Sequence, residues 1–92
     1  MTQRNEGAIH EMLLTVVRLL ADAPDEVQVE RISGEGGTFF RVAANSSDVG
    51  RLIGRNGQTV RALEAIANAD PERTGRRIRL EIEGSAGTYP RA

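Results

Sequence analysis

The sequence predicts an α+β domain whose elements follow in the order helix, strand, strand, helix, turn, helix, strand. Three observations support this fold class. The chain begins with the pattern of an amphipathic helix. Short segments bounded by glycine or proline alternate apolar and polar residues, as strands do. A Gly-x-x-Gly turn joins two helical segments near the middle of the chain. The 92 residues form one domain, which at this size buries enough surface for a modest core.

The first predicted helix is amphipathic. Asn5 is its expected N-cap, and Asp22–Pro24 ends it because proline lacks the backbone N–H that a helix interior needs. Residues 1–7 are expected to form a flexible N-terminus. The apolar positions of the helix recur at helical spacing and must cover another element, most simply a sheet: Ile9, Met12, Leu13, Val16, Val17 and Leu20.

Two strands are predicted next, at Val27–Ile32 and Thr38–Ala43. The glycine-rich segment Gly34–Gly37 joins them as a hairpin whose loop is longer than two residues. Phe39 and Phe40 are adjacent, and successive side chains of a strand point to opposite faces. One phenylalanine is therefore expected in the core and the other partly exposed as a partner contact.

A helix-starting cluster, Asn45–Asp48, precedes a short helix predicted for Ser47–Ile53. Asp48 lies in the first turn, where the helix dipole favours a negative charge. A second helix follows the Gly-x-x-Gly turn and ends at Asn68–Pro71. Its predicted apolar face consists of Val60, Leu63, Ile66 and Ala67.

The last predicted strand is Arg77–Glu83, where charged and aliphatic residues alternate. Glu81 and Glu83 share one face of it, and we expect a solvent-exposed face rather than a catalytic carboxylate pair. Residues 84–92 are expected to be a flexible tail, so the domain covers residues 8–83. In the middle strand and the second half of the domain, the aliphatic residues expected in the core are Val42, Ile53, Val60, Leu63, Ile66, Ile78, Leu80 and Ile82.

The composition excludes several kinds of site. The chain has no cysteine, and His10 is its only histidine, so we expect no metal site, no other cofactor and a solvated His10. No lysine is present to complete a nucleotide-binding P-loop, and an enzyme is not expected. Aromatic residues make up 3% of the chain, too few for a base-stacking platform. Neither a membrane span nor a signal peptide is visible, so a cytoplasmic protein with no membrane partner is expected.

The formal net charge of −1 hides an asymmetry. Residues 1–48 carry four arginines and eight acids, whereas residues 49–92 carry eight arginines and five acids. Val49–Leu63 holds three arginines and no acid. Local basic character of this kind is expected where phosphate is the partner, and the alternative is a chance cluster of surface arginines.

The Gly-x-x-Gly turn is the most informative motif. Gly54 and Gly57 enclose Arg55 and Asn56, and glycine reaches positive φ at low cost because it has no Cβ. The turn leads into a helix N-terminus, whose unpaired N–H groups attract anions. Arg55 can direct two hydrogen bonds to a phosphate, and Asn56 can donate or accept. These features predict phosphate and sugar contacts, and the alternative is an exposed polar turn with no ligand.

Two further arginines flank the turn. Arg51 and Arg61 lie on the helical segments before and after it, where each would extend a phosphate-binding track and add to its salt dependence. The alternative is ordinary solvated helix charge, which for Arg61 includes an i, i+3 pair with Glu64. The sequence leaves both interpretations open.

The order of elements, with Leu52–Val60 at its centre, resembles a type II KH domain, and the stretch from Asp48 to Gly54 is similar to small bacterial KH proteins of the KhpA type. The match covers Ile9–Glu83. It implies a three-stranded sheet backed by three helices, with RNA bound in a groove beside the turn. In this family a missing side chain at Gly50 would let the nucleic-acid backbone approach.

The resemblance also implies a function. A protein similar to this family is expected to bind single-stranded RNA with a Gly-x-x-Gly backbone clamp, as a post-transcriptional regulator or RNA chaperone tied to cell-envelope growth and cell shape. Its partners would be itself or a larger KH-containing protein, with no small-molecule substrate. The alternative is a KH-fold interaction module, a homodimer or heterodimer with weak or no RNA binding. The expected RNA-binding residues are Gly50, Arg51, Gly54, Arg55, Asn56, Gly57 and Arg61.

Overall fold

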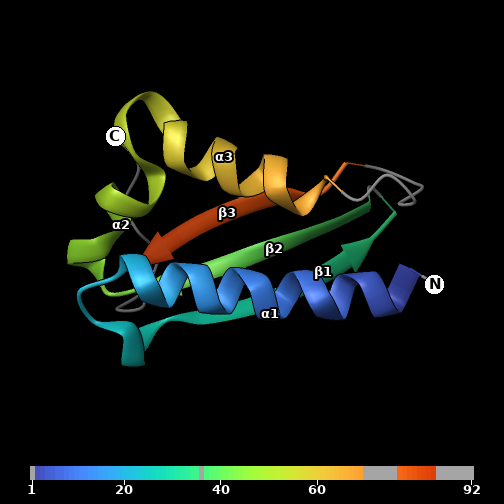
Figure 1. The fold of residues 1–92 in the computed structure, drawn as a ribbon, viewed down its shortest axis with the longest axis horizontal. Coiled ribbons are helices and arrows are strands. Elements are labelled where there is room, and N and C mark those ends of the chain that lie inside the picture. The colour runs from blue at the N-terminus through green and yellow to red at the C-terminus, as the bar shows by residue number, and fades with distance from the viewer. Residues whose placement is uncertain (1, 36, 70–76, 85–92) are drawn as a thin grey trace.

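A computed structural model describes residues 2–35, 37–69 and 77–84, with the backbone alone for residues 2–6 (Figure 1). It confirms the α+β fold class and the predicted order of elements. Three α-helices lie on one face of a three-stranded sheet, with α1 along β1 and α3 along β3 (Figure 1). The elements are α1 (Thr2–Leu20), the single-turn helix η1 (Pro24–Glu26), β1 (Gln28–Gly34), β2 (Gly37–Ala44), α2 (Ser46–Ile53), the tight turn η2 (Arg55–Gly57), α3 (Gln58–Ala67) and β3 (Arg79–Gly84).

The strands are ordered β1-β2-β3 across the sheet. β1 and β2 form an antiparallel hairpin in which Gln28 lies opposite Ala43. β3 pairs with β2 in parallel, with Leu80 opposite Phe40. A hairpin cannot join parallel strands, so the chain crosses over between them as α2, η2 and α3. This crossover puts the Gly-x-x-Gly turn at one end of the molecule, away from the β1–β2 hairpin loop (Figure 1).

The core lies between the sheet and the helices. α1 contributes Ile9, Leu13 and Val17, which are four residues apart and therefore share one helix face. Phe40 is fully buried and Phe39 is half-buried, which confirms that the two rings separate to opposite faces of β2. Ile53 and Val60 are half-buried and pack against this core, and the other predicted aliphatic residues found buried are Val42, Leu63, Ala67, Ile78, Leu80 and Ile82.

The prediction that Ile66 lies in the core is wrong, because 53% of this residue is exposed. α3 turns Leu63 and Ala67 toward the sheet, and both are buried. Ile66 follows Leu63 by three residues, which rotates it about 60° around the helix axis. The apolar stripe of α3 is thus wider than the surface that the sheet covers.

The helix start also differs from the prediction. α1 begins at Thr2, so Asn5 lies inside the helix and is not its N-cap. No glycine or proline precedes Asn5, and a nucleated helix gains one hydrogen bond for each residue added.

At the C-terminal end of the domain, Gly84 is the last residue of β3 rather than the first of a tail. The rest of the predicted tail, residues 85–92, and the loop 70–76 lie outside the described residues, and no described helix has the length and apolar character needed to cross a membrane.

His10 is not the solvated helix residue that its sequence context predicts. It is half-buried, and its Nε2 donates a hydrogen bond to the Val29 carbonyl oxygen at 2.8 Å. Its ring centroid lies 6.5 Å from that of Phe40. β1 is an edge strand, and outward-facing carbonyl groups of such strands need donors. His10 therefore ties α1 to the edge of the sheet.

Candidate nucleic-acid interface

The Gly-x-x-Gly turn has a backbone that only certain residues adopt. φ is 80° at Gly54, 56° at Asn56 and 76° at Gly57, all in the left-handed region. Asn56 is the only residue other than glycine with positive φ among the described residues, and asparagine is one of the few that tolerate this conformation. The turn is closed by hydrogen bonds from Gly54 N–H to Gly50 O (2.8 Å) and from Gly57 N–H to Gly54 O (3.0 Å). The residue types of the motif are therefore those that the turn requires.

Both glycines also allow close packing against α3. A Cβ on Gly54 would lie 2.7 Å from the backbone nitrogen of Thr59, closer than real side chains approach. A Cβ on Gly57 would lie 2.8 Å from Nη1 of Arg61. The guanidinium group of Arg61 thus lies directly against the turn, where the sequence predicted it would contribute.

The turn contains two helix starts without a side-chain cap. No side chain caps η2, whose first N–H groups are those of Arg55 and Asn56. Gly57 is the N-cap of α3, and no side chain caps that helix end. The side chains of Arg55 and Asn56 are exposed. Amide donors, an uncapped helix N-terminus and a guanidinium group together form a surface that suits a phosphate.

The predicted arginines differ in their surroundings. Arg55 and Arg61 are exposed and form no ion pair with any residue in the described ranges. Arg61 does not pair with Glu64, because the Glu64 carboxylate accepts a hydrogen bond from the Leu80 backbone N–H at 2.9 Å. The alternative of a local Arg61–Glu64 pair is therefore excluded, and the charge of Arg61 stays available beside the turn.

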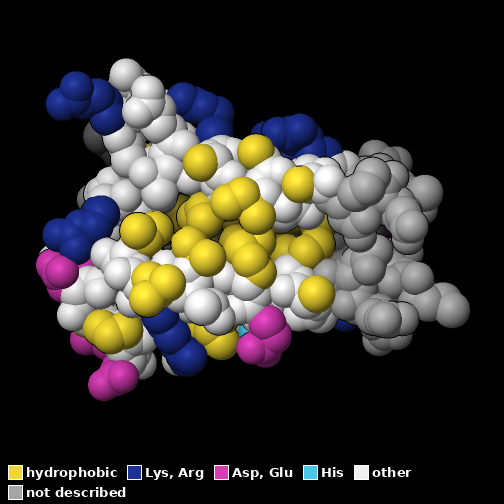
Figure 2. Space-filling view, viewed as in Figure 1, with side chains coloured by type: hydrophobic (Ala, Val, Ile, Leu, Met, Phe, Trp, Pro, Cys, Tyr) yellow, Lys and Arg dark blue, Asp and Glu magenta, His cyan; other side chains and the backbone are white. Residues whose placement is uncertain are grey.

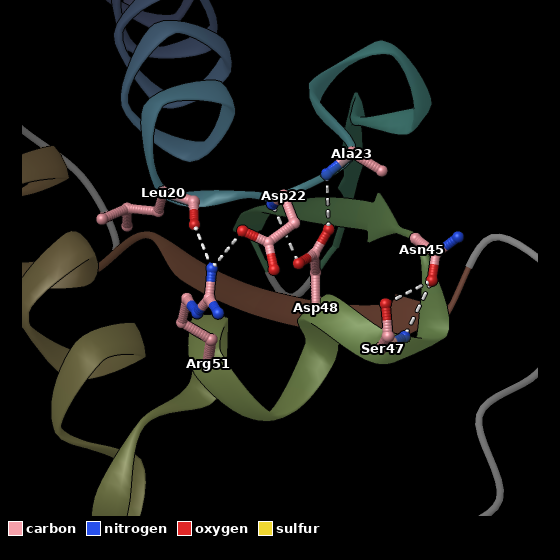
Figure 3. Close-up of polar contacts among 7 residues, drawn as sticks. All are labelled: Leu20, Asp22, Ala23, Asn45, Ser47, Asp48 and Arg51. Atoms are coloured by element: carbon pink, nitrogen blue, oxygen red, sulfur yellow. Dashed lines mark hydrogen bonds and ion pairs between the residues drawn. The ribbon is translucent and has the colours of Figure 1, made fainter.

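Arg51 is already bound within the protein (Figure 3). Its Nη1 donates to Oδ1 of Asp22 at 2.9 Å and to the carbonyl oxygen of Leu20 at 3.2 Å. The hydrogen bond and the charge of Arg51 lower the pKa of the Asp22 carboxyl below its ordinary value. Arg51 thus belongs to a pairing inside the protein, and the structure does not gather it with the donors of the turn.

Asp48 is a residue whose role the sequence did not reveal. It is only 1% exposed, and its carboxylate accepts hydrogen bonds from the backbone N–H groups of Asp22 (3.0 Å) and Ala23 (3.1 Å) (Figure 3). The spacing of Asp48 four residues before the buried Leu52 was the available signal, because i and i+4 share a helix face. We call the residues Leu20, Asp22, Ala23, Asp48 and Arg51 the α1–α2 joint.

Gly50 is not required by the fold. It lies within α2, is exposed, and a Cβ placed on it would meet no atom within 4 Å. A glycine inside a helix costs about 1 kcal/mol relative to alanine. The fold thus gives no reason for glycine here, whereas a close approach by a ligand backbone would give one.

The outer edge of β3 is held by side chains of α3 and its C-cap. The Asn68 amide donates to Ile78 O (3.0 Å) and accepts from Ile78 N–H (2.8 Å), which mimics a neighbouring strand. Glu64 provides the next acceptor, for Leu80 N–H. These contacts fix α3, and with it the second half of the turn, to the sheet.

The part of the sheet face opposite the helices that surrounds Arg41 is unsuited to phosphate. On that face Arg41 lies 3.7 Å from a carboxylate oxygen of Glu30, 3.8 Å from Glu81 and 3.7 Å from Glu83. The three negative charges exceed the single positive charge of Arg41. The Arg41 guanidinium also lies over the Phe39 ring, 5.9 Å from its centroid. Glu81 and Glu83 do lie on one outward face, as predicted.

A second surface lies between α1 and α3, where hydrophobic side chains gather (Figure 2). On α1, the side chains of this surface lie on the flank opposite His10, which binds β1. On α3, they lie on the flank opposite Glu64, which binds β3. Leu19 is 80% exposed, more than Ile66. The interhelical apolar surface, as we name it, consists of Met12, Val16, Leu19, Ala62 and Ile66.

Comparison with known proteins gives consistent matches. A family model described as KhpA/KhpB, KH domain, matches residues 10–82. Three similar proteins are each named RNA-binding protein KhpA. The one from Borreliella burgdorferi is 39% identical over 72 residues, which is 78% of this chain and 88% of that protein. The one from Leifsonia xyli subsp. xyli is 39% identical over 70 residues (76% and 90%), and the one from Treponema pallidum is 36% identical over 72 residues (78% and 90%). No solved structure gives a significant match.

Proposed function

Because the chain belongs to the KhpA/KhpB KH-domain family, we propose that it binds single-stranded RNA and grips the RNA backbone with the Gly54–Gly57 turn. The family is one of RNA-binding KH domains and not of enzymes. The observation that supports the clamp most directly is that no side chain caps the start of η2, at Arg55 and Asn56, or the N-terminus of α3.

The clamp would work through charge and close approach. A phosphate at the turn accepts hydrogen bonds from the Arg55 and Asn56 amides while the Arg55 guanidinium neutralises it. Arg61, whose guanidinium lies against Gly57, is placed to meet the next phosphate. Gly50 leaves room for the sugar–phosphate chain beside α2. A turn of this kind holds about four nucleotides, and its affinity falls as salt rises.

The test is a titration of a fluorescent single-stranded RNA pool with the wild type and with Arg55→Asp/Asn56→Asp at low and moderate salt. We expect the wild type to bind with a clear salt dependence and the double variant to lose at least about tenfold in affinity, since repulsion replaces the phosphate contact. Circular dichroism and thermal unfolding establish that both proteins fold.

The matched control is Thr15→Asp/Arg18→Asp, which changes the net charge by the same amount at exposed positions of α1. This control should bind RNA as the wild type does, unless the change in net charge alone weakens binding. Equal affinity of the wild type and the turn variant, or equal loss in the turn variant and the control, would remove the turn from the proposed site.

We also propose that the chain associates with a second copy of itself through the interhelical apolar surface. Exposed aliphatic residues on neighbouring helices form the kind of patch that marks an interface, and Leu19 and Ile66 are its exposed large side chains. Pairing would join two clamps that each hold few nucleotides and raise affinity through effective concentration. A larger KH-containing partner would use the same surface, and a role as post-transcriptional regulator or RNA chaperone rests on this pairing.

Sedimentation velocity over a range of protein concentrations tests self-association. The wild type should form a dimer, and Ile66→Ser should shift the equilibrium toward monomer because it removes exposed apolar area. Ala65→Ser, a neighbouring exposed residue outside the surface, should leave the dimer unchanged. A wild type that stays monomeric, or an Ile66→Ser variant that dimerises like the wild type, would contradict this assignment. If dimers form without any RNA binding, the interaction module becomes the function.

A further inference from the structure

We infer that the α1–α2 joint positions the clamp, so that RNA affinity depends on Asp22, Asp48 and Arg51 although none of them contacts RNA. This inference rests on the proposed function and deepens it. It also reassigns Arg51, whose sequence context suggested a phosphate ligand.

The buried end of the joint is the Asp48 carboxylate. Its two oxygens accept from two consecutive backbone N–H groups, those of Asp22 and Ala23. Asp48 is the only charged residue that is buried among the described residues. A buried carboxylate is costly unless it is hydrogen-bonded, so its presence here indicates that the segment after α1 is fixed to the first turn of α2.

The exposed end of the joint is Arg51, three residues after Asp48 and therefore on the same side of α2. It donates to the carbonyl oxygen of Leu20. Leu20 is the last residue of α1, so this oxygen accepts no hydrogen bond from within the helix. It also pairs with Asp22 at 2.9 Å. Arg51 thus completes the C-terminal end of α1 and joins it to α2 (Figure 3).

The position of the clamp follows from this arrangement. α2 has eight residues, and at about 1.5 Å per residue Asp48 lies about 9 Å and Arg51 about 4.5 Å along the helix from Gly54. A short, rigid helix carries any tilt at one end directly to the other. The donors of a binding site must be held within a fraction of an ångström of their working geometry, which is a task for the residues that support them.

The competing role for Arg51 is direct phosphate binding, in which Asp22 would be a competitor of RNA. The two roles predict opposite signs for Asp22→Asn. If Arg51 binds phosphate, the variant frees its guanidinium and RNA binds more tightly. If Arg51 positions α2, the variant loosens the joint and RNA binds more weakly.

The experiment compares RNA affinity for the wild type, Asp22→Asn, Arg51→Gln, the double variant and Asp25→Asn. Asp25→Asn is the matched control, because Asp25 is exposed and lies three residues from Asp22. It carries the same charge and forms no side-chain hydrogen bond or ion pair within the described part of the chain. We expect Asp22→Asn to bind about two- to fivefold more weakly than this control, as befits an exposed ion pair. The double variant should bind RNA no more weakly than Arg51→Gln, because the Asp22–Arg51 pair is already lost in Arg51→Gln.

Amide hydrogen exchange provides a readout that needs no RNA. Asp22→Asn and Arg51→Gln should raise exchange in α2 and shift the amide resonances of Arg55 and Asn56, whereas Asp25→Asn should not. Asp22→Asn that equals or exceeds the control in affinity, or that leaves those amides unchanged, overturns the inference. Failure of the clamp itself is a separate result, since it is read from the Arg55→Asp/Asn56→Asp variant.

Discussion

The side of α2 that faces α1 and the turn that follows α2 treat polar groups in opposite ways. At the joint, the Asp48 carboxylate and the Arg51 guanidinium are matched to acceptors and donors of the segment after α1. At the turn, no side chain caps η2 or α3. Polar groups that a fold satisfies internally hold it together, and those that it leaves free are where a ligand binds. The joint along α2 is therefore structural, and the turn after α2 is the proposed binding region.

Asp48→Asn should have the largest effect on stability. The amide has one acceptor oxygen, so one of the two backbone N–H groups would face an NH₂ group instead of an oxygen. We expect the free energy of unfolding to fall by about 1–3 kcal/mol, measured by urea denaturation. Asp25→Asn should change it by no more than about 0.5 kcal/mol. A loss as small as this control would mean that the joint contributes nothing to the fold.

Gly54→Ala tests the turn itself. The φ of 80° and the nearby Thr59 backbone nitrogen both oppose a side chain, so unfolding should become easier by about 1–3 kcal/mol. Asn56→Gly keeps the left-handed conformation and should leave stability within about 0.5 kcal/mol of the wild type. Its RNA affinity should nevertheless fall if the Asn56 side chain contacts the ligand. Equal stability of Gly54→Ala and the wild type would show that the turn is not under this constraint.

Gly50→Ala separates stability from binding. Alanine is the better helix former and meets open space here, so the variant should gain about 0.5–1 kcal/mol of stability. Its RNA affinity should decrease, because the new methyl group would stand where the RNA backbone approaches. Gly7→Ala, also helical and also facing open space, is the control that should gain stability without a change in RNA binding. Unchanged RNA affinity in both variants would remove Gly50 from the proposed site.

The pH dependence of the Asp22–Arg51 pair is the smallest expected effect. The pKa of Asp22 is lower in the folded protein, so its contribution to stability is present above the ordinary carboxyl pKa of about 3.9 and is lost as pH falls through the lower folded value. Thermal unfolding of the wild type and Arg51→Gln should therefore differ at pH 7, and the difference should shrink as pH falls below the ordinary carboxyl pKa. A difference that persists unchanged at low pH would mean that Arg51 acts through the Leu20 carbonyl alone.

The sequence was informative where a structural feature depends on neighbouring residues. Alternation along Arg77–Glu83 located β3, and the spacing from Ile9 to Val17 located the buried face of α1. The glycines at 54 and 57 identified a turn with positive φ, which the structure has at both positions. Periodicity and glycine chemistry are local properties, so one sequence suffices to recognise them.

Contacts between side chains far apart in the sequence became visible in the folded structure alone. Arg51 pairs with Asp22, 29 residues earlier, and His10 binds the carbonyl of Val29, 19 residues later. Ile66 has helical spacing like that of Leu63, yet the sheet covers one and not the other. The order of the elements, the turn and its residue types follow from local patterns in the sequence. The pairing of Arg51, the burial of Asp48 and the exposure of Ile66 depend on how the helices dock, because segments distant in sequence compete for each contact and only packing selects one.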